Sequence, residues 1–137
     1  MSQPARVLIV DDAATIRQYH RSVLEGGGYV VDEAVNGYEA LERAGAEDYD
    51  LFLVDVNMPV MDGFTLVQSL RRDEATAAVP IVMISTENKT DHEGRAQSAG
   101  ANLYLVKPVS PRELTTVADL LTVSAKATAG VSGGGRP

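Results

Sequence analysis

Short runs of consecutive apolar residues alternate along the chain with longer segments whose apolar residues recur at helical spacing. Short apolar runs bounded by turn residues are typical of strands in a parallel sheet, because helices cover both faces of such a sheet. The predicted strands cover residues 6–10, 29–34, 51–55, 80–85 and 103–106. The predicted helices cover residues 13–25, 37–46, 64–70, 91–99 and 111–123. The pattern therefore predicts five strand–helix units.

Strands and helices that alternate in this way predict a parallel sheet with right-handed crossovers and helices on both faces. We therefore expect an α/β fold, a doubly wound three-layer sandwich built on five parallel strands. A chain of 137 residues is long enough for one core of ordinary size. Residues 5–123 are predicted to form this single domain. Residues 124–137 are small and glycine-rich, so we expect a flexible tail there.

The charge and composition narrow the classes of partner. The formal net charge is −7 and the basic residues are scattered, which argues against a nucleic-acid-binding surface. The chain has no cysteine, no apolar run long enough to cross a bilayer and no signal-peptide pattern at its start. These features predict a soluble cytoplasmic protein without a membrane partner.

Polar residues with useful chemistry stand at the carboxyl ends of four predicted strands. They are Asp11 and Asp12 after the first strand, Asp55 on the third, Ser85 on the fourth and Lys107 after the fifth. The carboxyl ends of parallel strands lie at one edge of the sheet, so these side chains should converge. Converging carboxylates repel one another, and oxygen ligands without His or Cys favour Mg²⁺ or a similar hard cation. This combination suits phosphoryl transfer, with Asp55 as the candidate nucleophile.

With the motifs around them, these residues resemble the receiver domain of two-component response regulators. The motifs are Asp11-Asp12, Asp55 with Met58-Pro59 and Asp62-Gly63, Ser85, and Lys107-Pro108. Each motif is weak alone, but their order at successive strand ends gives a strong joint signal. The resemblance implies a flavodoxin-like sheet with strand order 2-1-3-4-5. Asn57 and the run Ser85-Thr86-Glu87 resemble the stand-alone, CheY-like type of chemotaxis regulator.

The resemblance also implies a role for each matched residue of the site. Asp55 matches the phosphoacceptor, and Lys107 matches the lysine that contacts the phosphoryl group. The implied Mg²⁺ ligands are Asp12 and Asp55 directly, Asp11 through a water molecule, and Asn57 through its backbone carbonyl. A cis peptide bond between Lys107 and Pro108 would direct the lysine, since cis bonds are a feature of proline.

Two further pairs of residues match positions that read or tune the phosphoryl group. Ser85 matches the switch hydroxyl and Tyr104 the aromatic switch position. The alternative for Tyr104 is an ordinary half-buried strand tyrosine. Asn57 and Glu87 lie two residues beyond the acceptor and the hydroxyl, where water would approach an acyl phosphate, so they are expected to tune its lifetime. The alternative for this pair is simple loop polarity.

The implied function is a signalling switch rather than an enzyme: a phosphoprotein that receives its phosphoryl group from a histidine kinase and then changes its affinity for an output protein. In chemotaxis this partner would be the flagellar motor switch. The expected output surface comprises residues 91–99, 103–106 and the helix from Pro111. A short partner helix or a second receiver would dock there, so we expect a monomer or a phosphorylation-dependent dimer.

Three alternatives fit part of the pattern. A receiver in a non-chemotaxis phosphorelay would share all these residues. A Mg²⁺-dependent phosphohydrolase of the aspartyl-phosphate class would need an acid two residues past Asp55, where this chain has Asn57. A flavin-binding relative would need a phosphate loop where Asp11 and Asp12 stand. His20 and His92 do not follow strands, so both are expected on helix surfaces rather than as ligands.

Overall fold

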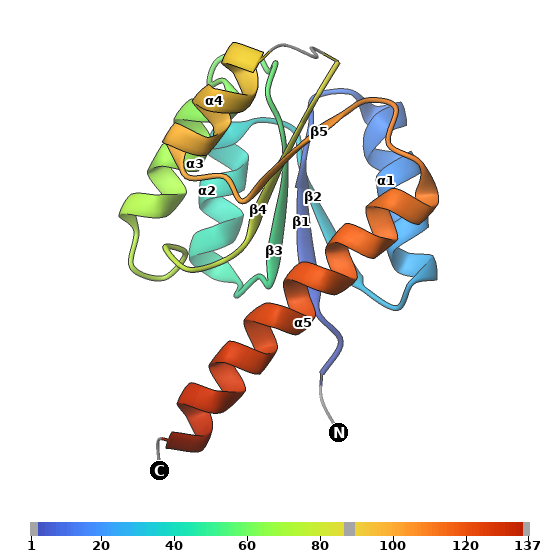
Figure 1. Ribbon diagram of the computed structural model, residues 1–137. Helices are drawn as coiled ribbons and strands as arrows, with labels where there is room; N and C mark the ends of the chain where they lie inside the picture. The colour runs from blue at the N-terminus through green and yellow to red at the C-terminus, as the bar shows by residue number, and fades with distance from the viewer. Residues whose placement is uncertain (1–2, 87–89, 136–137) are drawn as a thin grey trace.

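A five-stranded parallel sheet forms the centre of the molecule (Figure 1). The computed structural model describes residues 3–86 and 90–135. The strands are β1 (Arg6–Val10), β2 (Val30–Ala34), β3 (Leu51–Asp55), β4 (Ile81–Ser85) and β5 (Leu103–Val106). Their order in the sheet is β2-β1-β3-β4-β5, and every neighbouring pair is parallel. The predicted fold class and strand order are confirmed.

Helices cover both faces of the sheet, as a doubly wound fold requires. They are α1 (Ala14–Gly26), α2 (Gly37–Ala46), α3 (Gly63–Arg72), α4 (Thr90–Ala99) and α5 (Pro111–Gly135). Helices α1 and α5 lie together on one face, and α2, α3 and α4 lie on the other (Figure 1).

Alternation of side chains along the strands creates two separate cores. Successive residues of a strand point to opposite faces of the sheet. Leu8 and Val10 therefore pack with the side chains of α2, α3 and α4, whereas Val7 and Ile9 pack with those of α1 and α5. Every residue of the central strands β3 and β4 is buried, so these strands need apolar residues on both faces. This explains the unbroken apolar runs in the sequence.

Two short loops at the carboxyl edge of the sheet end in helix caps. The side chain of Asn36 accepts a hydrogen bond from the backbone N–H of Glu39 at 2.8 Å, which starts α2. The side chain of Asp62 accepts one from the N–H of Thr65 at 2.9 Å, which starts α3. Such caps satisfy backbone donors at the start of a helix. They fix where the loop after β2 and the loop after β3 end.

The last helix is longer than the sequence pattern predicts. We expected it to end near residue 123, whereas α5 continues to Gly135 and extends past the sheet in Figure 1. Alanine and lysine at residues 125–127 favour helix intrinsically. Predicting the end of α5 from its apolar positions was therefore wrong. That residues 124–137 form a flexible tail stays a prediction.

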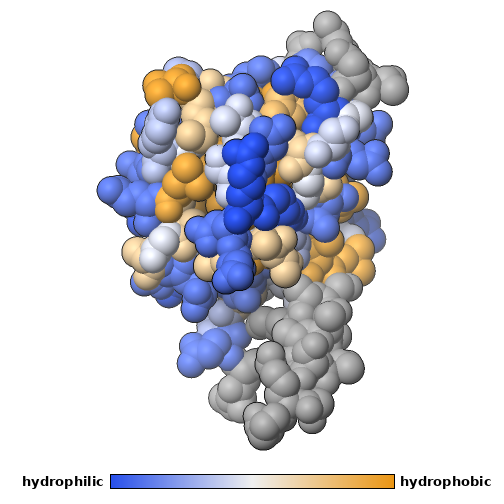
Figure 2. Space-filling model, turned by 90° about the vertical axis from the view of Figure 1, so that its left-hand side faces the viewer, coloured by the Kyte–Doolittle hydropathy of each residue, from blue (hydrophilic) through white to orange (hydrophobic). Residues whose placement is uncertain are grey.

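The outer surface of the α2, α3 and α4 layer is largely hydrophilic, with hydrophobic groups in small separate patches (Figure 2). This is the expected outer surface of amphipathic helices that bury one face. Within the described residues, no helix combines the length and apolarity needed to cross a membrane.

Candidate phosphoryl-transfer site

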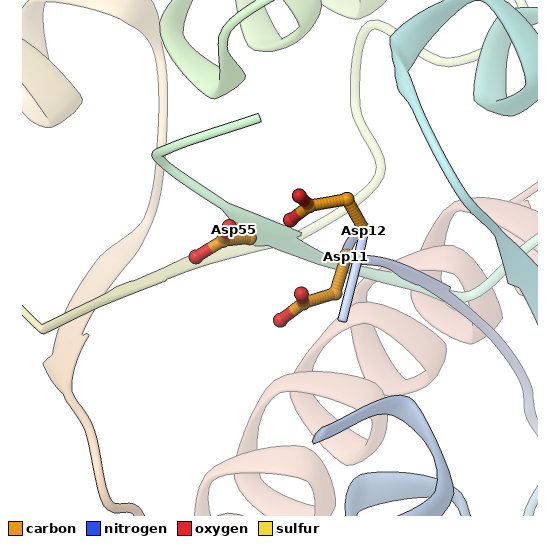
Figure 3. Close-up of side chains that lie close together, drawn as sticks. All are labelled: Asp11, Asp12 and Asp55. Atoms are coloured by element: carbon orange, nitrogen blue, oxygen red, sulfur yellow. The ribbon is translucent and has the colours of Figure 1, made fainter. Parts of the chain in front are cut away.

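Three carboxylates lie together where β1 and β3 end (Figure 3). Asp11 and Asp12 directly follow β1, and Asp55 is the last residue of β3. One carboxylate oxygen from each residue lies within 4.8 Å of the others. Asp11 and Asp55 are only 3% and 6% exposed, whereas Asp12 is exposed. The two strands are paired in parallel up to their carboxyl ends, and this pairing brings the three acids together.

Lys107, just beyond β5, reaches across to this cluster. Its Nζ donates hydrogen bonds to Oδ2 of Asp11 and to Oδ1 of Asp55, both at 3.0 Å. Its backbone N–H donates to the carbonyl of Ser85 at 2.8 Å, which anchors the end of β5 to the end of β4. The expected cis bond to Pro108 is present. Lysine and acids from three strands thus share one site.

The acid cluster carries more negative charge than Lys107 offsets. Burial raises the pKa of Asp55 from 3.8 to about 6, and the nearby carboxylates of Asp11 and Asp12 act in the same direction. The hydrogen bond from Lys107 opposes this rise without cancelling it. Burial alone would lower the pKa of Lys107, but its hydrogen bonds to Asp11 and Asp55 raise it overall. Perturbed groups of this kind gather at functional sites.

The backbone that carries Asp55 is held by a close contact with the start of α3. The N–H of Gly63 donates to the carbonyl of Val56 at 2.9 Å. A Cβ atom at residue 63 would overlap the backbone carbonyl of Asp55 and crowd the Met83 side chain. Only glycine allows this approach. The Asp62-Gly63 motif therefore both caps α3 and fixes the position of the strand that carries Asp55.

Ser85 and Tyr104 lie on neighbouring strands beside the acid cluster. Ser85 is fully buried at the end of β4, and the residue before it, Ile84, pairs with Asp55. Tyr104 on β5 pairs with Met83 on β4. Met83 and Ser85 are two residues apart, so their side chains project to the same face of the sheet. Tyr104 is half-buried and packs against the core under α3 and α4. The predicted switch residues therefore lie on adjacent strands, and Met83 links them because it pairs with Tyr104 and lies two residues before Ser85.

The roles expected for Asn57 and Glu87 stay predictions. Asn57 is exposed in the loop two residues after Asp55, at the rim of the site. Its proposed role as a carbonyl ligand stays a prediction. Glu87 lies outside the described residues.

His20 was expected on the surface of its helix, and that position was wrong. Its side chain is only 3% exposed, and it lines a small hollow between β1, β3 and α1 together with Asp11 and Asp55. Burial lowers the pKa of His20. A helical signal was available, because residues 16, 20 and 24 share one face of α1 and Leu24 is buried there. His92 is half-buried on α4, where its ring meets Phe64 edge-on at 6.0 Å between centroids.

The donor set of the cluster fits a hard divalent cation. All three side chains offer carboxylate oxygens, two of them from buried positions that a cation would relieve of repulsion. Oxygen ligands without imidazole or thiolate suit Mg²⁺, Ca²⁺ or Mn²⁺ rather than softer metals. The cluster can therefore bind a metal ion.

Comparison with known proteins agrees with this site. The sequence model of the family described as "Response regulator receiver domain" matches residues 7–119. "Chemotaxis protein CheY1" of Helicobacter pylori is 40% identical over 111 residues, which cover 80% of this chain and 90% of that protein. "Transcriptional regulatory protein ResD" of Bacillus subtilis is 39% identical over 109 residues, 80% of this chain. The matched part is only 44% of ResD.

Solved structures show the same fold. The chemotaxis response regulator CheY4 of Vibrio cholerae superimposes with a TM-score of 0.83 at 37% identity, over 87% of this chain and 99% of that one. A putative response regulator from Chloroflexus aurantiacus gives a TM-score of 0.85 at 35% identity, over 88% and 99% of the two chains. The chain therefore belongs to the response regulator receiver domain family.

Proposed function

We propose that this receiver domain takes a phosphoryl group from a histidine kinase onto Asp55 and thereby changes its affinity for an output partner. One observation supports this most: the buried Asp55 carboxylate lies with two other acids and a lysine at the carboxyl ends of β1, β3 and β5. In open α/β sheets this edge is where ligands bind.

The chemistry follows from the side chains present. A carboxylate oxygen of Asp55 attacks phosphorus, an O–P bond forms, and the P–N bond to the donor's histidine breaks with its electron pair going to that nitrogen. Lys107, already 3.0 Å from Asp55, donates to a phosphoryl oxygen and offsets its charge. The proposed Mg²⁺ ligands are Asp12, Asp55, Asp11 through water, and the carbonyl of Asn57. When bound, Mg²⁺ supplies the positive charge that one lysine lacks.

Accumulation of the phosphoryl group fits this site better than rapid turnover. A phosphohydrolase needs a general acid that protonates the leaving group. Asn57, two residues past the acceptor, has an amide side chain that cannot do so. The role proposed for this exposed residue is to limit the approach of water to the acyl phosphate.

The output surface proposed comprises α4, β5 and α5. A groove of about 430 Å³ lies between α4 and β5, and its lining includes Ala96, Leu103 and Tyr104. Leu103 is 40% exposed there and offers an apolar contact to a partner helix or a second receiver. Chemotaxis is the proposed pathway, because the relatives CheY1 and CheY4 match over most of their length. The likeness to ResD keeps a non-chemotaxis phosphorelay as the alternative.

Acetyl phosphate with Mg²⁺ should attach a single phosphoryl group to the protein through an acyl phosphate. Such a linkage resists acid and is cleaved by base, because the product is a mixed anhydride of a carboxylate. Intact mass spectrometry after acid and base treatment measures both properties. Full labelling in excess EDTA, or an ester-like linkage stable to mild base, would contradict the proposal.

A further inference from the structure

Arg17 reaches from α1 to the backbone that joins the first two acids of the site. Its Nη1 donates a hydrogen bond to the backbone carbonyl of Asp11 at 2.7 Å. Its Nε donates to Oε1 of Glu33 on β2 at 2.8 Å. The Arg17 side chain is only 14% exposed, which is low for an arginine on an outer helix.

The Glu33 carboxylate fixes the guanidinium group in this position. Its second oxygen accepts a hydrogen bond from Nη1 of Arg21 at 2.5 Å, one turn further along α1. The planar guanidinium group presents its donors in a rigid fork, so the bond to Glu33 sets the direction of the bond to Asp11. Lysine, with a single flexible ammonium group, cannot hold both acceptors in the same way.

The other polar atoms of Asp11 are also held. Its N–H donates to the carbonyl of Ala34 at 3.2 Å, which extends the pairing with β2. Its carboxylate accepts from the N–H of Ala13 at 2.9 Å and from Lys107 at 3.0 Å. The backbone carbonyl is the remaining acceptor, and Arg17 occupies it. Because the peptide unit is planar, fixing this oxygen also fixes the direction in which the chain continues to Asp12.

The position of the Asp12 carboxylate depends on the orientation of the Asp11–Asp12 peptide more than the positions of the two buried carboxylates do. Asp11 and Asp55 are enclosed by the sheet and hydrogen-bonded to Lys107, whereas Asp12 is exposed at the rim. Its carboxylate can face Asp55 only while the Asp11–Asp12 peptide keeps its orientation. We propose that Arg17 is a positioning residue that sets this peptide so that the carboxylates of Asp11, Asp12 and Asp55 converge on one cation. This inference rests on the proposed function.

Electrostatics and positioning predict opposite results for a neutral residue at 17. Removing a positive charge near a cation site should strengthen Mg²⁺ binding if charge alone matters. If Arg17 positions the ligands, Arg17→Met should instead weaken Mg²⁺ binding about tenfold, the usual effect of losing a group that orients a metal ligand. Arg17→Lys keeps the charge and should also bind Mg²⁺ more weakly than the wild type.

Arg21→Met is the matched control. It removes the same charge from the same helix and from the same Glu33, but Arg21 makes its other bond to Glu25 rather than to Asp11. Calorimetric titration of the full chain with Mg²⁺ alone, at constant ionic strength, gives the affinity of each variant. Thermal unfolding in EDTA verifies that each variant is folded, and Arg17→Lys provides the test if Arg17→Met is not.

The expected order of Mg²⁺ affinity is wild type equal to Arg21→Met within about twofold, then Arg17→Lys, then Arg17→Met about tenfold below the wild type. Equal or tighter binding by folded Arg17→Met or Arg17→Lys would overturn the positioning role alone. An equal loss in Arg21→Met would do the same, since the effect would then come from the ion-pair network. A wild type that does not bind Mg²⁺ would overturn the proposed function and this inference together.

Discussion

In EDTA at pH 8, the free energy of unfolding of Asp55→Asn should be about 3 kcal/mol larger than that of the wild type. The main reason is the burial of the Asp55 carboxylate, and the nearby carboxylates of Asp11 and Asp12 add to it. The pKa of Asp55 is about 6 in the folded protein, compared with the ordinary value of 3.8 that applies in the unfolded chain. That difference of roughly two pKa units converts to about 3 kcal/mol at 1.36 kcal/mol per unit. The Asp55 side chain is only 7% exposed, so solvent does little to screen this cost.

The sign of the pH dependence follows from the raised pKa. Folded Asp55 holds its proton more tightly than unfolded Asp55, so the wild type loses stability as pH rises from 3.8 through about 6. Asparagine does not ionise and escapes this loss. The advantage of Asp55→Asn should therefore be full at pH 8, partial near pH 5, and absent at pH 3.5, below both pKa values.

Urea unfolding in EDTA at several pH values measures this difference. Asp48→Asn is a suitable control, because it removes the same charge from an exposed position outside the site. Mg²⁺ should stabilise the wild type by mass action and stabilise Asp55→Asn much less. If Asp55→Asn is no more stable than the wild type at pH 8, the carboxylates do not strain the folded state, and the need for a metal loses its physical basis.

A phosphoryl mimic at Asp55 should shift Tyr104 between two environments, and Ser85→Ala should remove most of that shift. A charged phosphoryl oxygen offers the buried Ser85 hydroxyl a strong acceptor. Movement of Ser85 toward it would draw β4 along and open space for Tyr104, which pairs with Met83 on that strand. A ligand biases such a two-state element only through its different contacts in the two states. Coupling of this kind typically changes an equilibrium about 5- to 150-fold.

Fluorine NMR of protein containing 3-fluorotyrosine can follow Tyr104, with Tyr104→Phe identifying its resonance. Adding beryllofluoride and Mg²⁺ should move this resonance in the wild type and in Thr86→Ala, which removes the neighbouring exposed hydroxyl. In Ser85→Ala the mimic should still bind while the Tyr104 resonance stays near its original position. A full shift in Ser85→Ala would show that the hydroxyl is not the relay, and Tyr104 would be an ordinary strand residue.

The strands of the sheet could be predicted from the sequence, because the central strands β3 and β4 are buried on both faces and begin with unbroken apolar runs. Leu51 to Val54 show this most clearly, since all four are essentially buried. The parallel arrangement then places the ends of β1, β3 and β5 at one edge, which is why Asp11, Asp55 and Lys107 could be expected together. The order of strands and polar residues along the chain is therefore enough to predict which side chains meet at this edge.

Side chains that act across the fold were harder to predict. Arg17 and His20 lie on a helix whose polar residues read as solvent-facing, yet His20 is buried and Arg17 contacts β2 and the loop after β1. Their surroundings depend on how α1 packs on the sheet, which periodicity does not specify to one residue. The end of α5 was missed for another reason. Alanine and lysine at residues 125–127 still favour helix, so the apolar pattern alone does not mark where this helix ends.

Phosphoryl labelling of the wild type and Asp55→Asn in parallel tests the central claim most directly. Both proteins are incubated with acetyl phosphate and Mg²⁺, and intact mass and peptide mapping locate the label. Asp62→Asn serves as a control, because asparagine can still cap α3. The wild type and Asp62→Asn should each carry one phosphoryl group on the peptide that contains Asp55, and Asp55→Asn should carry none. Undiminished labelling of Asp55→Asn, or a label on another peptide of the wild type, would contradict the assignment of Asp55 as the acceptor.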